Sequence, residues 1–331
     1  MLGKKARLII NPISGTRSKE GLGTIVCNYL KPLNIDVEIR ESKAGGHAFE
    51  LASEAVANGY DMVLTAGGDG TVNEVARALS FSKCTLGILP YGSGNGLARS
   101  VGIPQDLLGA LKLIETGFTI SCDRGLVNNI PFFCTFGIGF DAAVSEKFAS
   151  MKKRGRITYI RSAFREFLNY QSRTYSIVIN DKVITEKALL IAVCNAPQYG
   201  NNAYIGPKAK LTDGLLDITV VHADNPFNTI LMSMDMFTGM LDKNRSIETF
   251  RVPELSILMP ENLPVHIDGE PMYMGKNLVI SCQPDALKIF SPQKQSEFRP
   301  FISPIRAILD DMKYDVMDKF RRLDQNNLRK G

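Results

Sequence analysis

The sequence has few of the patterns that mark metal-cluster, disulfide-stabilised or membrane-spanning proteins. Its six cysteines are scattered singly without a Cys-x-x-Cys pair, and it has only three histidines, so we predict neither a zinc site nor a disulfide framework. Single cysteines in apolar runs are typical of buried thiols in a reducing compartment. The apolar run at residues 8–10 ends at Asn11-Pro12 and is too short for a signal-peptide core. No apolar stretch approaches about 18 residues, so we expect a cytoplasmic protein without a transmembrane segment.

The chain also has only a small excess of positive over negative charge. The chain has 39 Lys and Arg against 34 Asp and Glu, a net charge of +5, which is too small to indicate nucleic-acid binding. A mild basic excess is compatible with anionic ligands, or with peripheral association at the inner membrane surface. With 331 residues, 44% of them hydrophobic, the chain is longer than one typical domain, and we expect two.

The most informative stretch is residues 61–75, which is typical of a strand, a glycine loop and a helix. Residues 62–65 form an apolar run suited to a buried strand, and apolar residues then recur at helical spacing, so a helix is predicted to begin near Thr71. Thr71 and Glu74 also fit a capping box at this helix start.

The glycine loop in this stretch has the chemistry of a phosphate site. Gly67, Gly68 and Gly70 allow close approach of a ligand, and the unpaired N–H groups of the helix start attract anions. Asp69 would repel phosphate unless a cation lay between them, which suggests Mg2+. The alternative is a tight turn between a strand and a helix with no ligand.

Strands and helices alternate regularly over the first 120 residues. Strands are predicted at residues 6–10, 36–40, 62–65 and 85–89, and helices at residues 19–30, 47–58 and 105–115 and from Thr71. This alternation indicates a parallel sheet with helices on both faces, which binds ligands at the carboxyl ends of its strands. Two more loops follow strands at that edge, residues 11–15 and the glycine-rich residues 90–98. Neither glycine-rich loop is a P-loop or a dinucleotide fingerprint, so another design of phosphate loop is indicated.

The pattern changes after residue 120. Short strands are predicted at residues 132–136, 175–180, 189–194, 215–221, 256–259, 263–267, 278–282 and 287–290. Many strands with few helices indicate an antiparallel β-sandwich. Helical stretches are predicted at residues 142–170, with a basic cluster at residues 152–156, and at residues 226–241.

We therefore expect an α/β nucleotide-binding domain at residues 1–120, a β-sandwich domain at residues 121–292 and a helical extension at residues 293–331. The ligand cleft would lie between the two domains. A helix is predicted from Ser303, with Pro304 at its first position and one apolar face. We expect that face to pack against a domain, and a helix lying on the membrane surface is the alternative.

Short motifs occur in order between residues 7 and 290. They are Asn11-Pro12-Ile13-Ser14-Gly15, Gly67-Gly68-Asp69-Gly70-Thr71-Val72-Asn73-Glu74, Pro90-Tyr91-Gly92-Ser93-Gly94-Asn95, Gly137-Ile138-Gly139-Phe140-Asp141, Asp213-Gly214-Leu215-Leu216-Asp217 and Asp268-Gly269-Glu270. Together they resemble the diacylglycerol kinase catalytic-domain family, which includes bacterial soluble lipid kinases and eukaryotic sphingosine and ceramide kinases. The glycine motif alone is also similar to that of NAD kinases and phosphofructokinases.

The resemblance implies that ATP binds between the domains and that the lipid lies in the β-rich domain. The implied nucleotide contacts are Asn11, Ser42, Gly67, Gly68, Asp69, Gly70, Thr71, Asn73 and Ser93. It also assigns Asp141 to substrate binding and Glu270 to deprotonation of the lipid hydroxyl. Strand alternation agrees in part, because His266, Asp268 and Glu270 share a face if the strand at residues 263–267 continues. The alternative is a hairpin turn at Asp268-Gly269 with a solvated Glu270.

Two features concern the metal. In bacterial relatives the segment matching Asp213 holds a structural Mg2+ through one aspartate and two backbone carbonyls, here Asp213, Lys210 and Leu215. Many bacterial members also have an aspartate after the asparagine of the third motif, where this chain has Gly96. Because Gly96 has no carboxylate, Asp69 is the best candidate for the catalytic metal network. The sequence does not tell how Gly96 in place of aspartate affects that network.

The sequence therefore predicts an ATP- and Mg2+-dependent lipid kinase with Glu270 and Asp69 as catalytic residues. Its lipid substrate would be met at the membrane surface and would be diacylglycerol or a sphingoid- or ceramide-type lipid. The rival predictions are a non-catalytic nucleotide- or lipid-binding protein and an NAD-kinase-like kinase of a soluble metabolite. A homodimer is possible, since the sequence does not give the oligomeric state.

Overall fold

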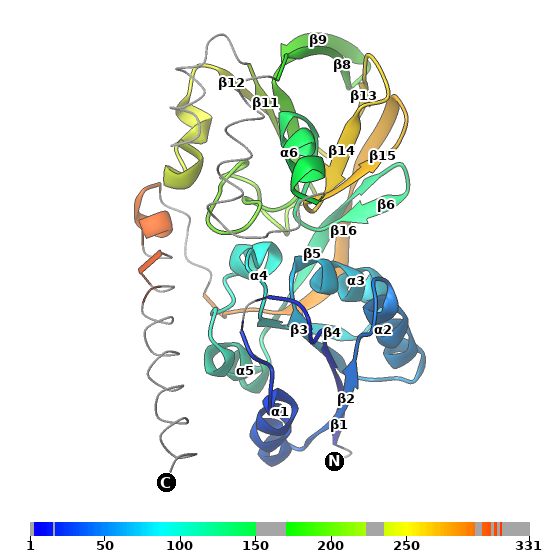
Figure 1. Ribbon diagram of the computed structural model, residues 1–331, viewed down its shortest axis with the longest axis vertical. Helices are drawn as coiled ribbons and strands as arrows, with labels where there is room; N and C mark the ends of the chain where they lie inside the picture. Colours follow the sequence, from blue (N-terminus) through cyan, green and yellow to red (C-terminus); the bar gives the residue numbers. More distant parts are fainter. Residues whose placement is uncertain are drawn as a thin grey trace.

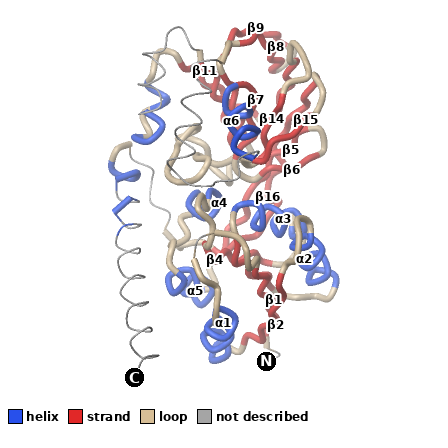
Figure 2. The backbone as a smooth tube through the Cα atoms, viewed as in Figure 1, coloured by secondary structure: helices blue, strands red, loops and turns tan. Residues whose placement is uncertain are grey.

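The computed structural model describes residues 3–15, 17–149, 170–222, 235–294, 300–305, 308, 309 and 312. Helices α1 to α5 surround one half of the molecule, and most of the later strands form the other half (Figure 1). The same division into a helix-rich and a strand-rich half is visible in Figure 2. The basic cluster at residues 152–156 and most of the helix expected after Ser303 lie outside the described residues.

The helix-rich half is built on a parallel sheet in the order β2-β1-β3-β4. Its strands are β1 (Lys4–Ile10), β2 (Ile35–Glu41), β3 (Met62–Gly67) and β4 (Thr85–Pro90). Its helices are α1 (Leu22–Leu30), η1 (Lys31–Leu33), α2 (His47–Ala57), α3 (Asp69–Leu79), α4 (Gly96–Val101) and α5 (Leu107–Thr116). Every residue of β3 and β4 is buried, because α2 and α3 cover one face and α1 and α5 the other (Figure 1). The predicted α/β arrangement is confirmed.

The strand-rich half contains a second, entirely antiparallel sheet in the order β12-β11-β10-β7-β14-β15. Its strands are β7 (Thr135–Gly139), β10 (Leu190–Cys194), β11 (Leu216–Val221), β12 (Ile247–Val252), β14 (Pro264–Ile267) and β15 (Glu270–Tyr273). Helix α6 (Phe140–Ala149) follows β7 directly, and the short η2 (Leu241–Lys243) precedes β12. A core of buried side chains, among them Phe136, Tyr175, Ile191 and Leu278, joins this sheet to the first one. The predicted antiparallel sandwich is therefore confirmed.

One long strand, β16 (Asn277–Phe290), joins the two halves. Its end pairs parallel with β4 at Ile289 and Leu86, and its start pairs antiparallel with β13 (Glu254–Leu258). Strands β8 (Arg173–Ile179) and β9 (Lys182–Ala188) extend the sheet beyond β13, while β5 (Thr119–Val127) pairs with β16 and with β6 (Ile130–Phe132). The ten-stranded sheet is thus parallel in one half and antiparallel in the other.

Two local expectations are wrong. The single strand expected at residues 132–136 is divided into β6 and β7, because the backbone N–H groups of Phe133, Cys134 and Thr135 donate to the Asp268 carboxylate. The predicted capping box is also absent. Helix α3 begins at Asp69, and Glu74 accepts from the N–H groups of Gly46 and Ala48, so it caps the start of the neighbouring α2.

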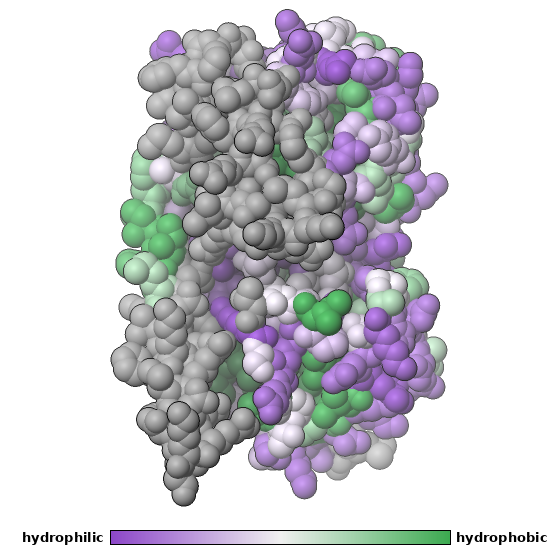
Figure 3. All heavy atoms as spheres, viewed as in Figure 1, coloured by the Kyte–Doolittle hydropathy of each residue, from purple (hydrophilic) through white to green (hydrophobic). Residues whose placement is uncertain are grey.

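The described part of the C-terminal helix is more exposed than expected. Ile305, Ile308, Leu309 and Met312 are 48–59% exposed, so the expectation that this face packs against a domain is wrong for these residues. Hydrophobic residues gather at the surface where this orange segment lies in Figure 1 (Figure 3). Within the described residues, no helix has both the length and the apolar character needed to cross a membrane.

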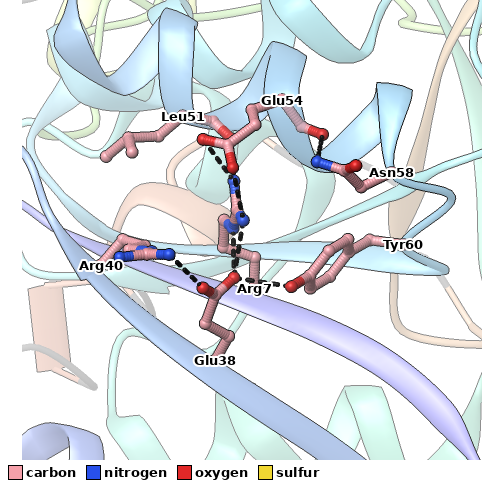
Figure 4. Close-up of polar contacts among 7 residues, drawn as sticks. All are labelled: Arg7, Glu38, Arg40, Leu51, Glu54, Asn58 and Tyr60. Atoms are coloured by element: carbon pink, nitrogen blue, oxygen red, sulfur yellow. Dashed lines mark hydrogen bonds and ion pairs between the residues drawn. The ribbon is translucent and has the colours of Figure 1, made fainter.

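A buried arginine ties β1, β2 and α2 together (Figure 4). The Arg7 side chain is 2% exposed, donates to Glu38 at 2.7 Å and to the Leu51 carbonyl at 2.9 Å, and pairs with Glu54 at 3.3 Å. Its guanidinium lies 4.8 Å from the ring centroid of Tyr60, whose hydroxyl donates to the same Glu38 at 2.6 Å. These contacts stabilise a buried guanidinium group, whose burial would be costly without charge-assisted hydrogen bonds.

Replacing Arg7 with Met tests this network. Arg7→Met keeps the apolar stem but removes the arginine donor from the Leu51 carbonyl and from the Glu38 and Glu54 carboxylates, of which Glu38 keeps Tyr60 and Arg40. The free energy of unfolding in urea should therefore fall by about 2–3 kcal/mol. Arg40→Met is the matched control, because Arg40 pairs with the same Glu38 but is 49% exposed. The control should lose less than about 1 kcal/mol. Equal losses in the two variants would contradict the importance of burial.

Candidate active site

Three loops meet at the carboxyl ends of β1, β3 and β4, where the sequence predicts phosphate binding. Asn11, directly after β1, donates from Nδ2 to Thr71 Oγ1 at 2.9 Å. A Cβ on Gly92, after β4, would lie 2.7 Å from the Cα of Gly68, so the two glycine-rich loops can touch only without a side chain there. Among the described residues, the N-cap of α3 is Gly68, which makes no side-chain cap hydrogen bond, and N–H groups at a helix start attract anions.

The other predicted nucleotide residues lie at the same edge of the sheet, in different environments. Ser42 directly follows β2, where it is buried and its N–H donates to the Ile10 carbonyl at 2.9 Å. Ser93 is exposed in the loop after β4. Asn73 on α3 instead reaches the strand-rich half, where its Nδ2 donates to Asp268 at 2.7 Å.

Asp69 joins the two glycine-rich loops. Its Oδ2 accepts from the N–H of Asn95 at 3.0 Å and its Oδ1 from the N–H of Gly96 at 2.6 Å, at the start of α4. Burial raises the pKa of the Asp69 carboxyl above its ordinary value, while these two N–H donors oppose the rise. The carboxylate therefore joins the start of α3 to the start of α4, a role that the sequence did not suggest.

The structure gives a steric account of Gly96. A Cβ at this position would lie 3.0 Å from the Tyr199 carbonyl oxygen and 3.5 Å from the Cys134 sulfur. An aspartate would thus require the segment around Tyr199 to shift by a few tenths of an ångström, because backbone packs closely against this position.

The Asp268-Gly269 pair forms the two-residue turn between β14 and β15. Both residues have positive φ angles, 48° and 86°, and Ile267 pairs with Glu270 across the turn, as in a type I′ hairpin. The expectation that the strand continues through Glu270 is therefore wrong, and the alternative hairpin turn is correct. The hairpin brings Glu270 to the glycine loop, since a Cβ on Gly70 would lie 3.0 Å from Glu270 Oε1.

Asp268 holds this hairpin against both halves of the molecule. Its Oδ1 accepts from the N–H groups of Cys134 and Thr135, and its Oδ2 accepts from the N–H of Phe133 and from Asn73 Nδ2, all at 2.7–2.9 Å. Burial raises the pKa of this carboxyl, and the same donors oppose the rise. A cavity of about 20 Å3, room for about one water, lies between Asp268 and Asp69.

Glu270 has the electrostatics of a base. Partial burial raises the pKa of its carboxyl, the Glu74 and Asp268 carboxylates raise it further, and Arg77 opposes them. The side chain nevertheless remains accessible to solvent, as a base that serves an incoming substrate must. A glutamate with a raised pKa accepts a proton more readily near neutral pH than an ordinary one.

Asp141, the predicted substrate residue, belongs to a buried polar cluster behind the hairpin. Its Oδ2 accepts from the Tyr199 hydroxyl at 2.9 Å and lies 3.0 Å from His266 Nε2. Its Oδ1 accepts from the N–H of Ala142 at 2.8 Å. The structure therefore brings Asp141 to the hairpin that carries Glu270.

Comparisons with known proteins agree with this arrangement. Residues 5–127 match the family model of the diacylglycerol kinase catalytic domain, and residues 135–291 match that of the YegS C-terminal NAD kinase beta sandwich-like domain. A protein of Pectobacterium atrosepticum named "Probable lipid kinase YegS-like" is 32% identical over 78% of this chain and 88% of its own length. The chain belongs to the diacylglycerol kinase catalytic-domain family. The solved structure of a "putative diacylglycerol kinase" from Bacillus anthracis aligns with a TM-score of 0.74 at 26% identity, over 88% of this chain and 97% of that one.

Membership of this kinase family makes the chain a kinase. Kinases commonly use metal ions to neutralise phosphate charge. Among the described residues, no three His, Cys, Asp or Glu side chains gather in a way that could hold a metal ion. At the Asp213 loop, the carboxylate already has a cationic neighbour, Arg251, at 3.4 Å. Arg251 also pairs with Asp217 at 3.2 Å, while Gly214 donates to Asp123 at 2.6 Å. One carboxylate and the Lys210 and Leu215 carbonyls are ligands of the kind that Mg2+ prefers, but few in number.

Sequence reasoning missed some of the site. It assigned no role to Asp268 beyond its place in a motif, or to Tyr199. It also passed over Lys19, whose Nζ donates to the Ser14 carbonyl and lies 5.4 Å from the ring centroid of Tyr91. Burial lowers the pKa of Lys19. Its place a few residues after the first loop was the available signal, since kinases need cations near their phosphates.

The Asp213 loop yields a prediction about stability. If it holds Mg2+, the ion should raise the melting temperature of the protein, and Asp213→Ala should abolish that rise and lower the melting temperature in metal-free buffer. Asp242→Ala is the control, because it removes a nearby carboxylate that pairs with Lys208 at 2.8 Å. An Mg2+-dependent rise that persists in Asp213→Ala would place the ion elsewhere.

Proposed function

We propose that this kinase is an ATP- and Mg2+-dependent lipid kinase that transfers the γ-phosphoryl group of ATP to a lipid hydroxyl. The observation that carries the proposal is the approach of Glu270 to Gly70, which sets a carboxylate with a raised pKa beside a loop suited to phosphate. Diacylglycerol and sphingoid- or ceramide-type lipids are the candidate acceptors. The lipid would enter along the strand-rich half from the inner membrane surface.

The proposed reaction uses the loops for position and Glu270 for the proton. The start of α3 and the neighbouring glycines bind the phosphates through backbone N–H groups. The lipid oxygen attacks the γ-phosphorus, a new O–P bond forms, the bond to the β–γ bridging oxygen breaks, and ADP leaves. Glu270 accepts the hydroxyl proton during the transfer. Mg2+, when bound, would neutralise phosphate charge.

Two residues are proposed around the metal and the lipid. Asp69 is the best carboxylate for the catalytic Mg2+, because it lies between the glycine loops, although both of its oxygens already accept backbone N–H groups. Asp141 is proposed to act near the lipid hydroxyl, since it belongs to the cluster behind Glu270. The Asp213 loop would hold the structural ion.

The rival functions differ in what they need from the site. A non-catalytic nucleotide- or lipid-binding protein would not need a carboxylate with a raised pKa facing the phosphate loop. A kinase of a soluble metabolite would use the same loops, and the relatives named as lipid kinases favour a lipid acceptor. Phosphoryl transfer from radiolabelled ATP to diacylglycerol, sphingosine, ceramide and undecaprenol would identify the acceptor. Incorporation into NAD alone would favour the rival kinase.

Glu270→Gln is the sharpest test of the proposed base. The amide keeps the size of the side chain but cannot accept the proton, so kcat should fall by about two to four orders of magnitude with nearly unchanged binding of ATP and lipid. The wild-type rate should also fall as the pH is lowered, because only the deprotonated carboxylate acts as a base. Since the pKa of Glu270 is raised, this fall should occur at a pH above the ordinary glutamate pKa of about 4.3. A loss of lipid affinity with kcat intact would make Glu270 an orienting group.

Asp69→Asn tests the catalytic metal. The variant should lose most of its turnover, and the loss should be greatest at limiting Mg2+. Because the new amide would meet the N–H of Gly96, the melting temperature must be measured in parallel, and a fall of a few degrees is expected from the lost hydrogen bond. Near-wild-type activity at limiting Mg2+ would exclude Asp69 as the metal residue.

A further inference from the structure

A buried histidine lies directly behind the hairpin that carries Glu270. His266 on β14 is 1% exposed, and its Nδ1 accepts from the N–H of Gly269 in the turn at 3.4 Å. Its other ring nitrogen, Nε2, lies 3.0 Å from Asp141 Oδ2. Both ring nitrogens are therefore engaged, one with the turn and the other with α6.

The partners determine the state of this ring. A backbone N–H can only donate, so Nδ1 must be unprotonated and accept from Gly269. With Nδ1 as the acceptor, Nε2 is the ring nitrogen that donates to the Asp141 carboxylate. Asp141 also accepts from the Tyr199 hydroxyl, and the Tyr199 ring stands edge-on to His266 with centroids 5.7 Å apart. Two side chains from separate segments, Tyr199 and His266, thus converge on one carboxylate oxygen.

The packing around the ring leaves it little freedom. His266 pairs with Gly137 of β7 across the sheet. A Cβ on Gly137 would overlap both His266 Nε2 and Asp141 Oδ2, so the pair occupies the space that a side chain would fill. The ring is therefore confined between β7, α6 and the turn.

We propose that His266 is a positioning residue, which acts through the Gly269 N–H to hold Glu270 against the glycine loop. Glu270 is the residue directly after Gly269, so a displacement of the turn moves its carboxylate. A displacement of about 1 Å at a reacting group costs on the order of 10²-fold in rate. The inference rests on the proposed role of Glu270.

Two substitutions test the hydrogen bonds of the two ring nitrogens independently. His266→Asn places an oxygen where Nδ1 lies, so it keeps an acceptor for Gly269 and loses the contact with Asp141. His266→Gln places an amide where Nε2 lies, so it keeps a donor for Asp141 and loses the acceptor for Gly269. Both leave one buried polar contact unmade, so a merely structural role predicts similar losses of stability and activity in the two variants.

The positioning role predicts different outcomes. In His266→Gln, kcat should fall about 10- to 100-fold with KM for ATP nearly unchanged, while His266→Asn should stay within about threefold of wild type. Hydrogen–deuterium exchange needs no substrate, and the peptide at residues 264–273 should gain one early-exchanging amide in His266→Gln and none in His266→Asn. Equal kcat values with equal exchange in the two variants would overturn the proposal.

A double variant distinguishes this proposal from the proposed function. If His266 acts through Glu270, adding His266→Gln to Glu270→Gln should lower kcat no further, whereas independent roles would multiply. If Glu270→Gln alone is fully active, the proposed base is wrong, and the exchange result still decides whether His266 holds the turn. Tyr273→Phe is the control, because it removes another tie between the hairpin and α6, the 2.8 Å bond to Glu146, and should leave kcat unchanged.

Discussion

The site depends on one carboxylate, that of Asp268. It accepts four N–H groups, three from the backbone of residues 133–135 and one from Asn73 on α3. Those backbone groups are lost to the sheet, which is why β6 and β7 are separate strands. The contact with Asn73 joins the turn between β14 and β15 to α3, the helix that starts at the glycine loop. An unsatisfied carboxylate would be costly at this depth, and the four donors offset that cost.

The second constraint is the gathering of negative charge at a place suited to phosphate. Asp69, Asp268 and Glu270 all have raised pKa values because burial disfavours their charged forms. Asp69 and Asp268 are stabilised by backbone N–H donors, whereas Glu270 has carboxylate neighbours and remains accessible to solvent. The surroundings of each group therefore distinguish two carboxylates held by backbone donors from a third that faces other carboxylates and solvent.

Much of this protein could be predicted from local patterns. Apolar runs followed by loops at residues 11–15, 67–71 and 90–95 predicted the parallel sheet and the edge where its loops meet. The change to short strands after residue 120 predicted the sandwich. Local patterns failed where a side chain found a distant partner. Glu74 fits a capping box in sequence, yet its carboxylate accepts from N–H groups at the start of α2, which is remote in sequence.

By itself, the sequence determined the fold class and the glycine loops, because strand and helix periodicity and turn chemistry are properties of neighbouring residues. The candidate base, Glu270, came instead from the resemblance of the Asp268-Gly269-Glu270 motif to that of the kinase family. Only the tertiary structure decided which of these groups meet. Asn73 and Asp268 are 195 residues apart, and nothing local to either predicts their hydrogen bond. The Asp268-Gly269 turn was one of the local alternatives, but the approach of Glu270 to Gly70, 200 positions earlier in the chain, was visible only in the tertiary structure. Long-range contacts depend on how whole sheets pack, which no short window of sequence encodes.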